Sequence, residues 1–136
     1  TVRNLVEDSR ESSIFRFIDL LFLKRRTCIA ELKKMLDEGT AELLILNRIA
    51  HQAEMLERYH MSILDGMTRE EALRAAGVYA KKQQEFLESA DIFPSDSVRK
   101  IFPFIARVDR ELKSFRPSDN LAGNPLLGLC SAILSL

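Results

Sequence analysis

Histidines and glutamates recur every third residue in the middle of the chain, as His51, Glu54, Glu57 and His60. The Glu57-x-x-His60 pair has the spacing with which some helical bundles bind two iron or manganese ions. On a helix that turns about 100° per residue, however, His51 and His60 fall on opposite faces. The apolar faces of the other predicted helices supply no further acidic ligands. We therefore expect structural or solvated histidines and no metal site, and a helical metalloenzyme is the least favoured interpretation.

Neither cysteine is placed for catalysis. Cys28 and Cys130 sit in apolar helical stretches, have no His or Asp neighbour and form no CxxC pair. We predict that both are small core residues, and that the protein belongs to a reduced, cytoplasmic compartment. The sequence also lacks the glycine-rich loops that bind phosphate. It thus predicts no catalytic residue, no cofactor and no small-molecule substrate, and we do not expect this chain to be an enzyme.

Basic residues gather in two clusters. The first comprises Lys24, Arg25, Arg26, Lys33 and Lys34, and the second comprises Arg107, Arg110, Lys113 and Arg116. Over the whole chain, twenty basic and twenty acidic side chains cancel, so the basic footprint of a domain that grips duplex nucleic acid alone is missing. We interpret both clusters as solvated faces, with a contact to phosphate or to an acidic partner as the alternative. The carboxylates that would balance them are Glu31, Asp37, Asp109 and Glu111.

The elements that position these residues are predicted to be helices. Hydrophobic residues make up 46% of the 136 residues, and five Gly and four Pro are too few for a fold of many tight turns. Apolar residues recur at steps of three and four, which is typical of helices. We predict an all-α fold: a single compact bundle of about six or seven helices, forming one domain over residues 1–136. The apolar run 126–136 is about half of the ~20 residues that a membrane span needs, so no membrane segment is expected.

Local signals divide the chain into elements. They predict an entry segment over 1–12, helices over 13–24, 27–38, 40–64, 68–77, 78–90 and 95–115, a loop over 116–124 and a last helix over 125–136. Segment 13–24 is apolar almost all round, which is typical of a central helix. Gly39 is predicted to end one helix and Thr40 to cap the next, while Thr68 and Glu71 should form a capping box. Pro103 is expected to kink its helix without breaking it, because the apolar period continues across it.

The apolar faces of these helices predict the core. Its expected members are Phe15, Ile18, Leu32, Leu36, Ile49, Leu56, Phe102, Ile105 and Leu112, and Tyr79 should also point inward. The last helix is apolar on more than one face, so one face can dock on the bundle while the other forms an exposed patch of the kind that marks protein contacts. We therefore expect a partner interface on this helix and the one before it, unless the last helix is itself a central core helix. The candidate interface residues are Arg107, Arg110, Lys113, Leu126, Leu129 and Ile133.

An ordered series of short motifs runs through most of residues 5–115. It comprises Ile14-Phe15 with Asp19-Leu20-Leu21, then Ala30-Glu31-Leu32-x-x-Met35-Leu36-x-x-Gly39, then Leu43-Leu44 with Ile49 and Gln52, then Val78-Tyr79-Ala80-Lys81-Lys82 with Ala90, and finally Val108-Asp109-Arg110-Glu111-Leu112-Lys113. This series resembles the C-terminal helical domain of the delta subunit of bacterial DNA polymerase III, a clamp-loader subunit. The resemblance depends on the order of the motifs, since none of them is specific alone. Pro103, inside a helix that is usually continuous, and the long loop from Arg116 to Asn124 depart from the family's pattern.

The resemblance implies a role in assembly. The helical domains of five clamp-loader subunits pack into a collar, and the ATPase-like modules and the part that opens the sliding clamp lie N-terminal to this domain. It implies that the chain is a C-terminal fragment of a longer protein, that its partners are the other clamp-loader subunits, and that it reaches the sliding clamp and DNA only through the rest of the assembly. The alternative is a helical protein-interaction or regulatory domain unrelated to replication. A degenerate nucleotide-binding module upstream of Thr1 would favour the first interpretation.

Overall fold

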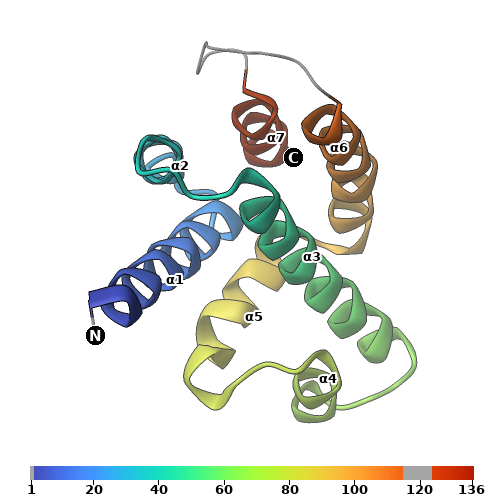
Figure 1. The fold of residues 1–136 in the computed structure, drawn as a ribbon. Helices are drawn as coiled ribbons and strands as arrows, with labels where there is room; N and C mark the ends of the chain where they lie inside the picture. Colours follow the sequence, from blue (N-terminus) through green and yellow to red (C-terminus); the bar gives the residue numbers. More distant parts are fainter. Residues whose placement is uncertain (1, 115–123) are drawn as a thin grey trace.

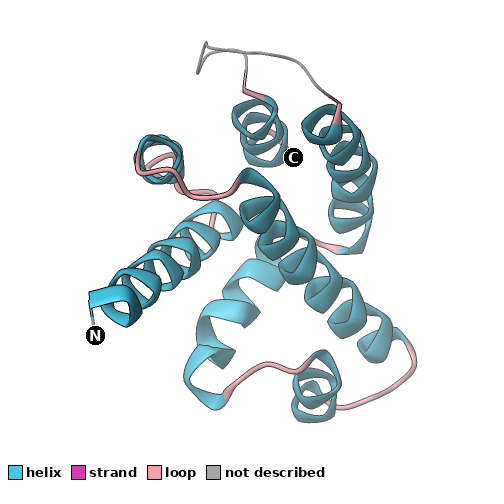
Figure 2. Ribbon diagram, in the orientation of Figure 1, coloured by secondary structure: helices cyan, strands magenta, loops and turns pink. Residues whose placement is uncertain are grey.

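Helix α3 (Glu42–Leu64) lies at the centre of the computed structural model, which describes residues 2–114 and 124–136 (Figure 1). The other described elements are α1 (Val2–Phe22), α2 (Cys28–Asp37), α4 (Arg69–Ala76), a 3₁₀ turn η1 (Ala80–Lys82), α5 (Gln83–Ile92), α6 (Ser95–Lys113) and α7 (Pro125–Leu134). Every regular element in these two ranges is helical (Figure 2), so the predicted all-α bundle of about six or seven helices is confirmed. None of the described helices is both long and apolar enough to cross a membrane.

Three helices pack directly on α3, and the others pack on those three. Helices α1, α6 and α4 pack directly on it, α6 and α4 most extensively. Helix α2 packs on α1, and α7 fills the space between α6, α1 and α2. Helix α5 follows η1 and packs on α1, below α3 in the view of Figure 1. The arrangement places the end of α1, the middle of α3 and the start of α5 around one region of the surface.

Several helix ends follow from local sequence. After α2, Gly39 adopts a left-handed φ of 83°, a conformation that side chains with a Cβ disfavour. Its N–H donates to Leu36 O at 3.1 Å and the Thr40 N–H donates to Met35 O at 2.9 Å, which is the Schellman pattern. The predicted capping box of α4 is also confirmed, because the Thr68 side chain accepts from the Glu71 N–H and the Glu71 carboxylate accepts from the Thr68 N–H. Helix α6 continues through Pro103, so the prediction that this helix does not break is confirmed, and the kink stays a prediction.

Other boundaries differ from the sequence predictions. Helix α1 is continuous from Val2, so the described residues 2–12 of the predicted entry segment belong to the same helix as the residues that follow. The cap of α3 is Ala41, and the Thr40 hydroxyl is buried with no hydrogen-bond partner among the described residues. Helix α5 begins at Gln83, five residues later than predicted, because Tyr79 is extended and η1 precedes the α-helix. The predicted loop 116–124 lies outside the described residues except for Asn124, which caps α7.

The predicted core is confirmed in part. Ile18, Leu32, Ile49 and Leu56 are buried, whereas Leu36, Phe102, Ile105 and Leu112 are half-buried against the same core. Two predictions are wrong: Phe15 is 49% exposed and Tyr79 is 81% exposed. Helix α1 is not the central helix that its sequence predicts, since its packing buries the face that carries Ile14, Phe17 and Leu21 and leaves Phe15 beside it.

Candidate functional site

The three basic residues of the predicted interface lie on the exposed side of α6. Arg107, Arg110 and Lys113 are all exposed, in agreement with a solvated face. Lys113 Nζ lies 3.1 Å from Asp109 Oδ2, one helical turn away. No described carboxylate lies within 4 Å of either arginine. The outer face of α6 therefore carries two positive charges available to a partner.

The three apolar residues of the predicted interface lie in the core. Leu126, Leu129 and Ile133 are 0–2% exposed, so they do not form the expected surface patch. The physical reason is that α7 packs against α6, α1 and α2 at once, and a helix with neighbours on several sides buries more than one apolar face. Lys24, two residues after the end of α1, donates from Nζ to the Leu136 main-chain oxygen at 2.6 Å and so contacts the last residue of this segment. The interpretation of the last helix as a core helix is the one that the structure supports.

A pocket opens between α1, α3 and the η1–α5 segment. It has a volume of about 440 Å³ and an apolar lining contributed by Ile18, Phe22, Met55, Val78 and Phe86. We call it the α1–α5 pocket. Phe15 from α1 and Tyr79 from the turn before η1 also line it, and both expose much of their rings. The two residues whose burial was wrongly predicted thus flank one opening.

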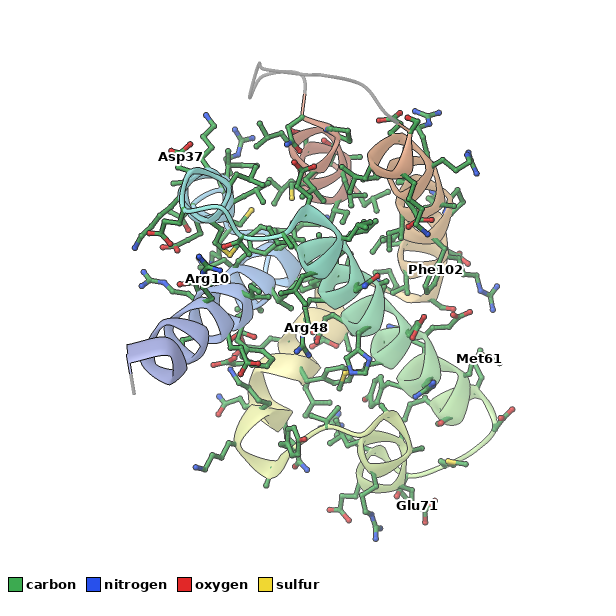
Figure 3. The ribbon with its side chains drawn as sticks, in the orientation of Figure 1. Arg10, Asp37, Arg48, Met61, Glu71 and Phe102 are labelled. Carbon is green, nitrogen blue, oxygen red and sulfur yellow. The ribbon has the colours of Figure 1, made fainter. Side chains whose placement is uncertain are left out.

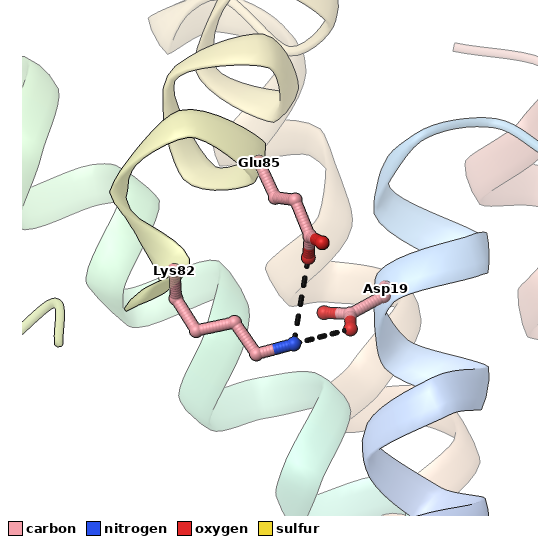
Figure 4. A network of polar contacts seen from close by, with 3 residues as sticks. All are labelled: Asp19, Lys82 and Glu85. Atoms are coloured by element: carbon pink, nitrogen blue, oxygen red, sulfur yellow. Dashed lines mark hydrogen bonds and ion pairs between the residues drawn. The ribbon is translucent and has the colours of Figure 1, made fainter. Parts of the chain in front are cut away.

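An ion-pair network forms one wall of the α1–α5 pocket. Lys82 Nζ lies 2.7 Å from Asp19 Oδ2 on α1 and 3.4 Å from Glu85 Oε2 on α5 (Figure 4). The hydrogen bond to Asp19 is the main cause that raises the pKa of Lys82 above its ordinary value. The network links Asp19 of α1 to Lys82, which lies 63 positions away in the sequence. Because Lys82 remains about half exposed, we expect this network to stabilise the fold by little.

Arg48 provides a second cation in the lining of the same pocket. It projects from the N-terminal half of α3 toward the space between α1 and α5 (Figure 3), and its guanidinium carbon lies 5.4 Å from the centre of the Phe15 ring. No carboxylate of the described residues lies within salt-bridge distance of it. His51, one turn further along α3, lines the same pocket. Unlike Lys82, Arg48 is thus held by an aromatic ring and keeps its hydrogen-bond donors for another group.

The remaining titratable candidates have structural surroundings. His60 Nε2 lies 2.8 Å from the Phe93 carbonyl oxygen and joins α3 to the end of α5, whereas His51 is exposed in the pocket. The described residues contain no group of three or more side chains arranged to hold a metal ion. Cys28 and Cys130 are free and buried, which confirms them as core residues, and burial raises the pKa of both thiols.

Sequence reasoning did not find the α1–α5 pocket. Its walls come from three segments of the chain. The spacing of apolar residues predicts which face of each helix is buried, but it does not predict that these segments lie next to one another. One signal was nevertheless present, because Asp19 and Lys82 both belong to the ordered motifs. Comparisons with protein-family models, with curated proteins and with solved structures found no match to this chain.

Proposed function

We propose that this chain is the helical oligomerisation domain of a clamp-loader subunit of the delta type, which packs with other clamp-loader subunits in a collar and so supports loading of the sliding clamp in DNA replication. The observation that carries the proposal is the ion pair between Asp19 and Lys82. Each residue was selected as part of a separate motif of the series that resembles the delta family. The two motif positions meet at 2.7 Å across 63 residues, and this contact supports the interpretation of the separate motifs as parts of one fold.

The apolar and turn positions of the motifs support the same proposal. Ile14, Leu21, Leu32 and Met35 from the first two motifs are all buried in one core. Gly39 closes the second motif in the left-handed conformation for which a glycine is suited. An all-helical domain is also the fold that the resemblance implies. These four apolar residues and Gly39 therefore have structural roles that are consistent with membership of one family, whereas Phe15, Leu43, Leu44 and Tyr79 of the same series are exposed.

The proposed role of this domain is to support the assembly structurally. A bundle whose helices are tied by a continuous core can hold neighbouring subunits at fixed distances while other modules of the assembly bind nucleotide, clamp and DNA. Its contacts must come from exposed side chains, because α7 is committed to the core. The exposed candidates are the outer face of α6 and the opening flanked by Phe15 and Tyr79.

The test is reconstitution of the clamp loader. The natural chain that contains these residues is mixed with the other purified subunits, with and without residues 1–136, and assembly is followed by size-exclusion chromatography with light scattering. We expect deletion to abolish assembly while circular dichroism shows that the remaining modules stay folded. Assembly that survives the deletion would overturn the proposal and favour a helical interaction domain that works outside replication.

A further inference from the structure

We propose that the α1–α5 pocket is a docking site for a segment of a partner protein in which an apolar side chain stands next to a carboxylate. The inference rests on the proposed function only in taking the partner to be another subunit of the same assembly. The apolar side chain would enter the pocket between Phe15 and Tyr79, and the carboxylate would bind Arg48. The size, the exposed aromatic rings and the distribution of charge each support one part of this assignment.

The volume and lining of the pocket fit the apolar anchor. About 440 Å³ lies within the range of pockets that bind small ligands or side chains, and Ile18, Phe22 and Phe86 give it an apolar floor. The exposed rings of Phe15 and Tyr79 stand at its opening. Aromatic side chains in such positions are enriched among the residues that dominate the energy of protein interfaces. An apolar side chain that enters between them would remove both rings from water.

The charges identify the group that must accompany the anchor. The ammonium of Lys82 already has two carboxylate partners, at 2.7 and 3.4 Å, which offset its positive charge. Arg48 has no such partner among the described residues, and the Phe15 ring at 5.4 Å restricts where its guanidinium can lie. A positioned guanidinium binds a carboxylate with two parallel hydrogen bonds. The partner segment should therefore carry Asp or Glu.

The shape of the surface favours a segment of polypeptide over a small molecule. A second, more open hollow of about 520 Å³ shares Phe15, Asp19 and Lys82 with the α1–α5 pocket. It extends along α1 past Ser12 and Arg16. A small carboxylic acid would use only the first hollow, whereas a peptide can follow both. The second hollow would then receive the residues that flank the anchor.

Cross-linking identifies the occupant. A photoreactive benzoylphenylalanine replaces Tyr79 at the opening, and in a control chain it replaces Leu64, which is 75% exposed at the far end of α3. Each chain is reconstituted with the other purified subunits and irradiated, and the linked peptides are mapped by mass spectrometry. We expect the Tyr79 position alone to link to a subunit peptide with an apolar residue beside Asp or Glu. A link between two copies of this chain, or equal linkage from both positions, would overturn the inference.

Charge reversal then tests the role of Arg48. Arg48→Glu should weaken binding of the partner subunit by about tenfold or more, the loss typical of a central arginine. Arg58→Glu is the matched control, because it makes the same charge change at an exposed position of the same helix that does not line the pocket. Reversal of the linked carboxylate to Lys should restore binding to the Arg48→Glu chain.

The outcomes separate this inference from the proposed function. Loss of assembly on deletion of residues 1–136, with Arg48→Glu and Arg58→Glu both binding normally, overturns the docking site and leaves the oligomerisation role standing. Assembly that survives the deletion overturns the oligomerisation role. Thermal unfolding of both charge variants by circular dichroism must match the natural chain, since a misfolded Arg48→Glu chain would also lose binding. If Arg48→Glu fails that check, Arg48→Gln takes its place.

Discussion

Replacement of Leu129 by Ala should destabilise the folded chain by about 3 kcal/mol. Leu129 is 2% exposed on α7, where the sequence predicts a partner contact and the structure shows core. The substitution removes three carbon atoms, which cost about 2.4 kcal/mol at about 0.8 kcal/mol for each buried methylene. The cavity adds to this transfer term, and measured losses for Leu→Ala in cores are about 2–5 kcal/mol. Packing against α6, α1 and α2 together should limit collapse around the cavity.

Urea denaturation followed by circular dichroism measures this loss. With an m-value of about 2 kcal/mol/M, the midpoint should fall by about 1.5 M. Leu64→Ala is the control, because Leu64 is 75% exposed and its truncation should change the midpoint little. A loss below about 1 kcal/mol at Leu129, equal to that at Leu64, would refute the assignment of α7 to the core and return it to the surface.

Three further predictions follow from backbone conformation and ionisation. Gly39→Ala should cost about 1–2 kcal/mol because φ is 83° there. Gly128→Ala, in the exposed interior of a helix with free space around the new Cβ, should stabilise by about 0.5–1 kcal/mol. The urea midpoint should therefore fall for the first variant and rise for the second, and a midpoint that moves the other way would contradict the prediction for that variant. Cys28 and Cys130 should react slowly with Ellman's reagent at pH 8 and quickly once the chain is unfolded, because burial keeps both thiols protonated and covered, and rapid reaction of the folded chain would contradict this. Lys82→Met should lower the free energy of unfolding by less than about 1 kcal/mol at pH 7. Because folding raises the pKa of Lys82, its contribution to stability is complete below the ordinary pKa of 10.5 and is lost as pH rises through the pKa of the folded chain. A difference in stability between the two chains that grows above pH 10.5 would have the wrong sign.

The features that could be predicted from the sequence are those encoded within a few residues. The left-handed turn at Gly39 and the capping box between Thr68 and Glu71 each depend on side chains or conformations of neighbouring residues. The burial of Leu32 and Leu56 follows from the helical spacing of apolar residues, because an amphipathic helix packs with its apolar face toward the core. The all-helical fold follows from the same periodicity.

The features that could not be predicted depend on which elements meet. The apolar character of the last helix was consistent with either a core helix or a helix that carries an exposed patch. Leu129 belongs to the core because α7 packs against three other helices. The ion pair of Asp19 with Lys82 joins segments whose distance in the sequence hides their contact. Arg48 gives no sign in the sequence that it will face Phe15 instead of solvent.

Three of the differences between the sequence predictions and the structure lie close together, near the C-terminal half of α1 and the start of α5. Phe15 is exposed on a helix that was predicted to be central. Tyr79 is exposed in a segment that was predicted to be an amphipathic helix. Helix α5 starts later than predicted because η1 precedes it. If α5 began at Val78, Tyr79 would take a helical conformation in place of its extended one, with φ of −67° and ψ of 148°. Lys82 would then shift relative to Asp19. Sequences that otherwise agree with their fold tend to break local rules where function requires it. Phe15, Tyr79 and the η1 residue Lys82 all line the α1–α5 pocket, which supports the use of this surface independently of its charge and volume.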